Sequence, residues 1–211
     1  TIREKPGISP VILPKYLLGR CVFLRLADMS LALPKYDECI VSLDMDPDHR
    51  EAYNKFQTDL ITELRKALRR GDKSLLSKYL QALLCYPEQP WNGEVVKNRE
   101  NQIVAIARSL PEDRTYPKEQ ELIDIIKEEK RQVRKTLVYC THTDRRDVTA
   151  RINQKLSAEG IRCDVLTAAV EAEKREDWIA ARTKGIDVLI TNPKLVQTGL
   201  DLLDFQTFIF D

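Results

Sequence analysis

Residues 162–191, RCDVLTAAVEAEKREDWIAARTKGIDVLIT, decide the fold of this chain. Apolar runs at 162–166 and 187–191 enclose a charged segment, 171–184, whose length is typical of a helix and which Gly185 ends. Two strands joined by a helix of this length pair in parallel through a right-handed crossover. The stretch therefore predicts a strand–helix–strand unit within a parallel sheet.

The same alternation continues on both sides of this unit. We expect strands at 136–140 and 207–210, and a helix at 144–157 that Gly160 ends. Before them, apolar residues on one side of the segment after Pro117 predict a further helix that leads into the first strand. The predicted fold class is α/β: a RecA-like parallel sheet with flanking helices, preceded by a mainly helical insertion.

That insertion is expected at about 47–116. Apolar residues recur at three- and four-residue steps over 48–68 and again over 75–84, which predicts two helices separated by a break at Gly71. The proline-rich segment 87–117 is expected to be a loop with a short strand or helix near 102–107.

Before the insertion, the β-rich segment 38–44, ECIVSLD, predicts a strand, and Asp46 is the expected N-cap of the next helix. Four prolines in residues 1–35 indicate a partly extended connecting segment. Residues 36–211 then form the main domain. Because the chain ends on the strand pattern FQTFIFD, we expect the natural protein to continue beyond it.

Composition excludes several classes of protein. The chain of 211 residues is 43% hydrophobic and 32% charged, yet its net charge is +1, so no global basic field points to nucleic acid. The five cysteines are widely spaced and only two histidines are present, which argues against a zinc site and for reduced thiols. No apolar run is long enough to span a membrane. We expect a cytoplasmic protein, or a nuclear one in a eukaryote, with no membrane partner.

Polar side chains follow the predicted strands where ligands bind in open parallel sheets. They are Thr141, His142, Thr167, Thr191 and Asn192. Their hydroxyl and amide groups can donate hydrogen bonds to phosphate oxygens. The alternative is that these residues only cap helices and close strands.

Other possible sites are less specific. The sequence Gly-Asp-Lys-Ser at 71–74 imitates a phosphate loop but lacks its earlier glycine, and no Gly-x-Gly-x-x-Gly is present. A self-contained nucleotide hydrolase is therefore excluded, and a small-molecule nucleotide enzyme is disfavoured. Cys140 and His142 lack a third, orienting group, so a packed Cys140 is favoured over a nucleophile.

A basic cluster, Arg145, Arg146 and Arg151, together with the run 130–135, suits a phosphate backbone or simply a solvated helix face.

The order of the segments resembles the second RecA-like lobe of superfamily-two helicases and translocases, most closely the Swi/Snf-like branch. The resemblance rests on the order of CVFLRLADMSLALPKYDECIVSLDMDPDHREAYNKF, LLCYPEQP, the segment leading to TLVYCTHT, EAEKREDWIAA and VLITNPKLVQTGLDL. It covers almost the whole chain. The Thr-Gly-Leu-Asp at 198–201 differs from the glycine pair and Asn of the Swi/Snf-like branch and is similar to the DEAD-box form.

The resemblance implies one lobe of an ATP-dependent DNA motor, with DNA preferred over RNA and with the first RecA-like lobe as partner. ATP and Mg²⁺ would bind between the two lobes of the intact protein. The implied nucleic-acid contacts are Thr141, His142, Thr167, Thr191 and Asn192. The implied nucleotide contacts are Thr198, Gly199 and Asp201.

The phosphate loop, acidic metal-binding motif and arginine motif of this family are absent from these residues, so no catalytic or metal-binding residue is assigned. We expect the parent protein to be an ATP hydrolase and this chain alone to be inactive. The alternative function is a non-catalytic interaction module, in which the helices of residues 47–85 present a partner-binding face on an α/β platform.

Overall fold

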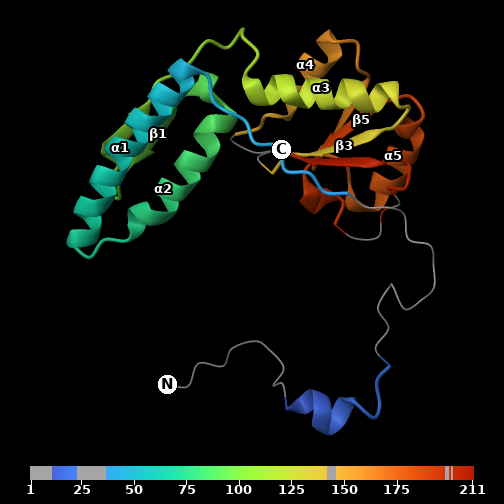
Figure 1. The fold of residues 1–211 in the computed structure, drawn as a ribbon. Coiled ribbons are helices and arrows are strands. Elements are labelled where there is room, and N and C mark those ends of the chain that lie inside the picture. The colour runs from blue at the N-terminus through green and yellow to red at the C-terminus, as the bar shows by residue number, and fades with distance from the viewer. Residues whose placement is uncertain (1–10, 23–36, 142–145, 198–199, 201) are drawn as a thin grey trace. The chain divides into compact units, whose positions relative to one another are not determined.

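The computed structural model of the protein describes residues 11–22, 37–141, 146–197, 200 and 202–211 (Figure 1). The chain divides into two compact units, residues 1–42 and 43–211. In the first unit, the described residues include one short π-helix, η1 (Leu13–Leu17). All other helices and strands of the described residues belong to the second unit.

The first part of this second unit is mainly helical, as the sequence predicts. It contains α1 (Pro47–Arg69), α2 (Ser74–Cys85) and an antiparallel hairpin of β1 (Glu94–Lys97) and β2 (Ile103–Ala107). Phe56 is fully buried in the core that the helices share with the hairpin. Of the short strand or helix expected near residues 102–107, the structure has the strand, β2, whereas β1 was not predicted.

The ends of α1 follow their local sequence. Pro47 occupies its first turn after the N-cap Asp46, a position where the missing N–H of proline costs nothing. Gly71 has a φ of +78°, a left-handed conformation that terminates a helix and that glycine adopts without strain. The predicted break at Gly71 is confirmed.

The second part is a four-stranded sheet in the order β4-β5-β3-β6, with every neighbouring pair parallel. Its strands are β3 (Thr136–Tyr139), β4 (Cys163–Leu166), β5 (Val188–Thr191) and β6 (Thr207–Phe210). All four residues of β5 are buried, which explains its continuous apolar sequence. The predicted α/β fold with a parallel sheet is confirmed, and it is consistent with a RecA-like α/β fold.

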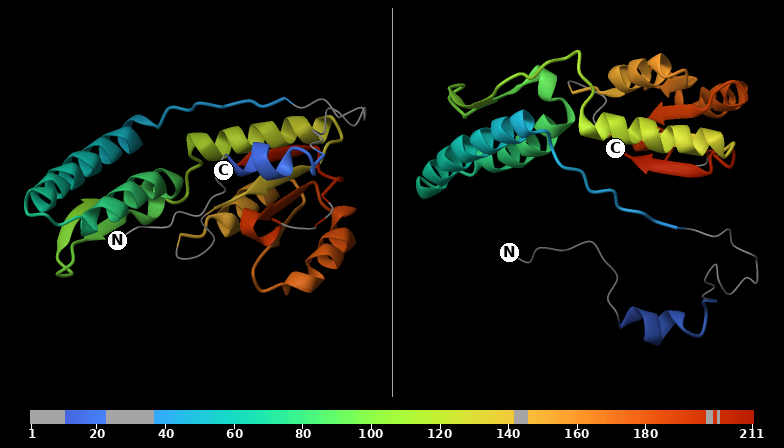
Figure 2. Two further views of the ribbon diagram at one scale, coloured as in Figure 1. Left: turned by 90° about the horizontal axis from the view of Figure 1, so that it is seen from below. Right: turned by 45° about the horizontal axis from the view of Figure 1, so that its top comes forward.

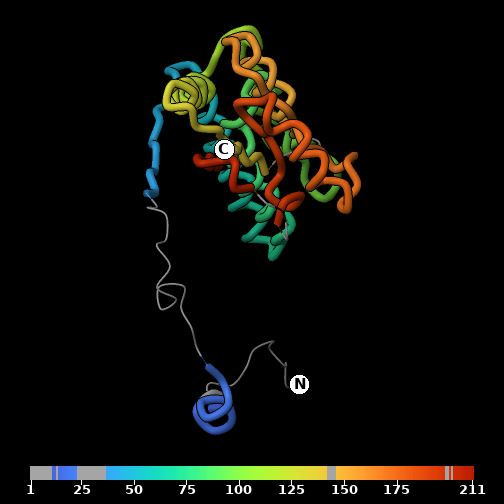
Figure 3. The backbone as a smooth tube through the Cα atoms, turned by 90° about the vertical axis from the view of Figure 1, so that its right-hand side faces the viewer, coloured from blue at the N-terminus to red at the C-terminus, as the bar shows by residue number. Residues whose placement is uncertain are grey.

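Helices cover both faces of this sheet. α3 (Pro117–Arg131) and α4 (Thr149–Ala158) share one core cluster with Val138, whereas α5 (Arg175–Thr183) shares another with Leu137. Successive side chains of a strand point to opposite faces, so the two clusters lie on opposite sides of the sheet. Figure 3 views α3 end-on beside the strands.

Four 3₁₀ turns complete the described elements. They are η3 (Tyr86–Glu88), η4 (Pro90–Asn92), η5 (Ala172–Lys174) and η6 (Pro193–Leu195).

The helical part lies beside the sheet part (Figure 2), and two arginines join them. Arg146 donates to both carboxylate oxygens of Glu94 in β1, at 2.7 and 3.0 Å. Arg151 of α4 lies with its guanidinium carbon 3.9 Å from the ring centroid of Trp91. Both residues belong to the basic cluster of the sequence, and their charges are used inside the protein.

One sequence prediction is wrong, and another differs in where a helix begins. Residues 38–44 form no strand: no described strand pairs with them, and Ile40 is 88% exposed. A β-rich sequence forms a strand only where a neighbour supplies hydrogen bonds. The helix expected at 144–157 is present as α4 but begins at Thr149, where the carboxylate of Asp147 accepts hydrogen bonds from the backbone N–H and the hydroxyl of Thr149 in an Asx turn.

The carboxylate of Asp187 connects the amino end of β5 to the segment before β4 and to α3. Its carboxylate accepts hydrogen bonds from the backbone and guanidinium of Arg162, the latter at 2.6 Å, and pairs with Lys130 of α3 at 2.9 Å. The hydrogen bond from the Arg162 side chain lowers the pKa of Asp187 far below its usual value, burial opposes this, and Lys130 lowers it further.

We predict that Asp187→Asn lowers the free energy of unfolding by about 2 kcal/mol at neutral pH, because the variant cannot form these charge-assisted hydrogen bonds. Since folding depresses this pKa, the contribution is present above the unfolded value of 3.8 and disappears as pH falls below it. Urea unfolding across this range should show the difference between wild type and variant narrowing in acid. The exposed Glu173→Gln is the control and should change stability by less than about 0.5 kcal/mol. A difference that stays constant below the unfolded pKa would contradict this role.

Candidate nucleic-acid interface

The carboxyl edge of the sheet has a topological switch point between β3 and β5. The connection after β3 runs through α4 on one face. The connection after β5 places Val196 and Phe205 in the core of the opposite face. Where neighbouring strands send their connections to opposite faces, the strand ends leave a crevice that binds ligands in open α/β sheets.

Asn192 bridges the two strand ends at this point. Its Nδ2 donates to the backbone oxygen of Thr141 at 3.1 Å, and its Oδ1 accepts from the backbone N–H of Lys194 at 2.9 Å. One amide thus ties the end of β5 to the end of β3 and begins the turn η6. Asn192 has 9% of its surface exposed, so most of it serves the protein itself.

Thr191 also has an internal hydrogen bond. It is fully buried, and its hydroxyl donates to the backbone oxygen of Leu166, the last residue of β4, at 3.2 Å. This position agrees with the strand-closing alternative for Thr191. Its hydroxyl fixes the spacing of the β4 and β5 ends.

Thr141 and Thr167 are exposed at the same edge. Thr167 follows Leu166, whose register partner is Thr191, and Thr141 lies two residues beyond Tyr139, which also pairs with Thr191. The structure therefore brings together Thr141, Thr167, Thr191 and Asn192, but leaves only the two outer threonines with exposed side chains. His142, Thr198, Gly199 and Asp201 lie outside the described residues.

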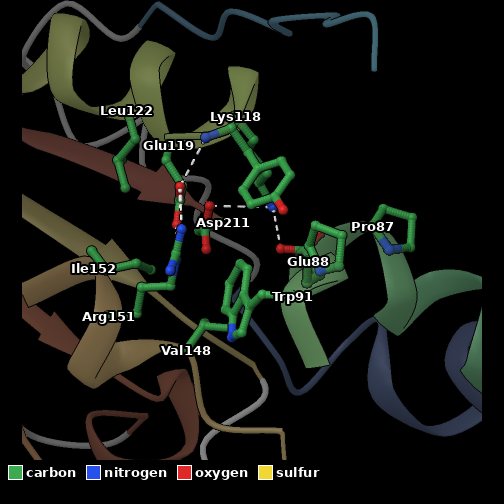
Figure 4. Close-up of a pocket in the computed structure, with 12 residues that line it drawn as sticks. Pro87, Glu88, Trp91, Lys118, Glu119, Leu122, Val148, Arg151, Ile152 and Asp211 are labelled. Carbon is green, nitrogen blue, oxygen red and sulfur yellow. Dashed lines mark hydrogen bonds and ion pairs between the residues drawn. The ribbon is translucent and has the colours of Figure 1, made fainter. Parts of the chain in front are cut away.

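A partly buried ionic group at the end of β6 was missed by the sequence interpretation (Figure 4). Lys118 of α3 contacts Glu88 at 2.6 Å and Asp211 at 3.2 Å. Burial raises the pKa of Asp211, and Lys118 only partly offsets this increase. Burial lowers the pKa of Lys118, but the two carboxylates raise it more. Asp211 directly follows a strand, as Thr141 does. The same search for polar residues after predicted strands could therefore have found it in the sequence.

Arg151, near this ionic group, makes several contacts within the protein. Its guanidinium donates to Glu119 and to the backbone oxygens of Glu112 and Arg114, at 2.7 and 2.8 Å for the two backbone oxygens, while its plane covers Trp91. A guanidinium held in this way has few donors left for a phosphate. The described members of the run 130–135 also have internal partners: Lys130 pairs with Asp187, and Arg134 with Glu129.

Cys140 is a packed thiol. It is buried, and burial raises its pKa to about 12, so the nucleophilic thiolate is not formed near neutral pH. The described residues contain no group of three or more His, Cys, Asp or Glu side chains able to hold a metal ion.

Comparisons with known protein families and with curated proteins found no match for this chain. No helix in the described part of the chain is long and apolar enough to cross a membrane.

We predict that Asn192→Asp destabilises the protein by about 1–3 kcal/mol in urea unfolding, because a carboxylate keeps the acceptor for Lys194 but cannot donate to the Thr141 oxygen. Asn54→Asp, the same chemical change on the exposed side of α1, is the matched control and should have little effect. Equal stability of the two variants would show that the bridge between β3 and β5 contributes nothing.

Proposed function

We propose that this chain is the second motor lobe of an ATP-dependent DNA helicase or translocase of the Swi/Snf-like type. The observation that carries the proposal is the switch-point edge, where exposed Thr141 and Thr167 flank the bridging Asn192. The order of sequence motifs supports it independently.

In this proposal the edge holds one strand of DNA by its phosphates. The hydroxyls of Thr141 and Thr167 donate to phosphate oxygens, as polar side chains do in sequence-independent contacts. Asn192 and Thr191 act as positioning residues, because their hydrogen bonds fix the ends of β3, β4 and β5 relative to one another.

The segment after Asn192 connects the DNA to the nucleotide. It passes through Val196, which packs in the core of the α5 face, and reaches Thr198, Gly199 and Asp201 before returning to that core at Phe205. A displacement at Asn192 is then transmitted along a short, anchored connection. ATP and Mg²⁺ would supply the phosphoryl-transfer chemistry in the cleft with the first lobe, and this chain contributes the polar residues at 198–201 to that cleft.

A second candidate function is a protein-interaction module. Leu76, Leu80 and Leu84 recur every four residues along α2 and are 44%, 54% and 69% exposed. A row of exposed leucines on one helix is typical of a surface that a partner covers. Replacing the three with glutamine should then abolish partner capture while leaving DNA binding unchanged.

The motor proposal is tested in a polypeptide that joins this chain to its first lobe. Asp201→Ala should lower DNA-stimulated ATP hydrolysis by about tenfold, equivalent to about 1.4 kcal/mol of transition-state stabilisation, while DNA affinity stays the same. The double variant Thr141→Val and Thr167→Val should instead weaken DNA binding, with a normal hydrolysis rate at saturating DNA.

Each variant serves as the control for the other, since one changes the nucleotide side and the other the DNA side. Unchanged ATP hydrolysis in Asp201→Ala, together with unchanged DNA affinity in the double threonine variant, would refute the proposal.

A further inference from the structure

A concentration of positive charge lies at one end of the helical part. Six exposed cations come from three segments: the end of α1 and the residue after it, the start of α2, and the turn of the β1–β2 hairpin. We call this set the basic tip; its members are Arg69, Arg70, Lys73, Lys78, Lys97 and Arg99.

Interactions within the protein bring these segments together. Lys78 of α2 donates to the backbone oxygen of Lys97 at 2.8 Å, which joins the helix to the hairpin. Asp72, in the α1–α2 turn, has a lowered pKa chiefly because the backbone N–H of Ser74 donates to it, and Arg99 and Lys78 add smaller electrostatic contributions. The hairpin turn and the helix turn therefore lie close enough for their charges to interact.

The basic tip has few internal counter-charges. Among the residues that the structure describes, no carboxylate lies within ion-pair distance of any of the six cations. The only carboxylates in the same turns are Asp72 and Glu100. By contrast, Arg146, Arg151 and Lys130 each pair with a carboxylate.

Helix electrostatics explain only part of the set. Cations stabilise a helix near its C-terminus, which accounts for Arg69 and Arg70 at the end of α1. Lys73 is the N-cap of α2, where the helix dipole disfavours positive charge and where no acidic residue occurs in the first turn. Lys78 lies one turn further along the helix, beyond the reach of this effect. Helix electrostatics therefore give no reason for Lys73, or for Lys97 and Arg99 on the hairpin, whereas Lys78 has its hydrogen bond to the hairpin.

We propose that the basic tip binds the phosphate backbone of duplex DNA without sequence preference, as a second binding surface separate from the carboxyl edge of the sheet. Duplex DNA presents about one negative charge every 1.7 Å along its axis, which suits six cations spread over three segments better than a single anion does. The net charge of +1 does not reveal this tip, because acidic residues elsewhere balance it. The proposal does not depend on ATP hydrolysis.

The test measures binding of the chain to a short, fluorescein-labelled DNA duplex by anisotropy over a series of salt concentrations. The tip variant carries four changes to glutamine: Arg70→Gln, Lys73→Gln, Lys97→Gln and Arg99→Gln. We expect its affinity at low salt to fall more than tenfold. The slope of log affinity against log salt should decrease by about 0.9 for each phosphate that the variant no longer neutralises.

A matched control removes four exposed cations away from the tip: Lys55→Gln, Arg131→Gln, Lys174→Gln and Lys184→Gln. It changes the net charge by the same amount and should leave most of the salt slope intact. Equally weakened binding in the two variants would overturn the proposal, because it would indicate a general charge effect. Absence of DNA binding by the wild-type chain at low salt would overturn it as well.

Two further titrations distinguish the remaining explanations of DNA binding. Polyglutamate that binds the tip as tightly as DNA, with the same salt slope, would overturn the proposal in favour of an acidic protein partner. The double threonine variant of the carboxyl edge is titrated in parallel. If it fails to bind DNA while the tip variant still binds, the proposed motor function stands and the basic tip is refuted.

Discussion

The fixed hand of the connections between parallel strands is the constraint on which the rest of the structure depends. From β3 the chain moves across the sheet to β4, then returns to β5. Right-handed crossovers in opposite directions must lie on opposite faces, which places α4 on one face and α5 on the other. The switch point between the ends of β3 and β5 follows from this topology.

The polar side chains at the two edges of the sheet differ in how far they are used within the protein. At the amino edge, Asp187 is surrounded by Arg162 and Lys130, and its charge is fully used for stability. At the carboxyl edge, Thr191 and Asn192 hold the strand ends together while Thr141 and Thr167 remain exposed. The proposed binding edge thus combines two buried, hydrogen-bonded side chains with two exposed hydroxyl groups.

Most of the fold could be predicted from the sequence, because the apolar period of α1 and α2 and the apolar run of β5 are local signals. The exposed segment 38–44 has the local sequence signal of a strand. A strand also needs a neighbouring strand to pair with, and no described strand pairs with this segment. The partners of charged side chains could not be predicted either. Arg146, which belongs to a cluster that suits phosphate in the sequence, pairs in the fold with Glu94, 52 residues away. For the candidate site, sequence located the edge but not which side chains are buried there, since the Thr191 hydroxyl bonds to Leu166, 25 residues earlier.

The central claim, that the carboxyl edge of the sheet faces nucleic acid, is tested most directly by NMR. Amide chemical shifts of the ¹⁵N-labelled chain would be followed during titration with a DNA duplex. The account predicts saturable shifts at Thr141, Thr167 and Asn192, and none at Gly160 or Asp187 on the amino edge. Saturable binding that leaves the three carboxyl-edge amides unchanged would contradict it.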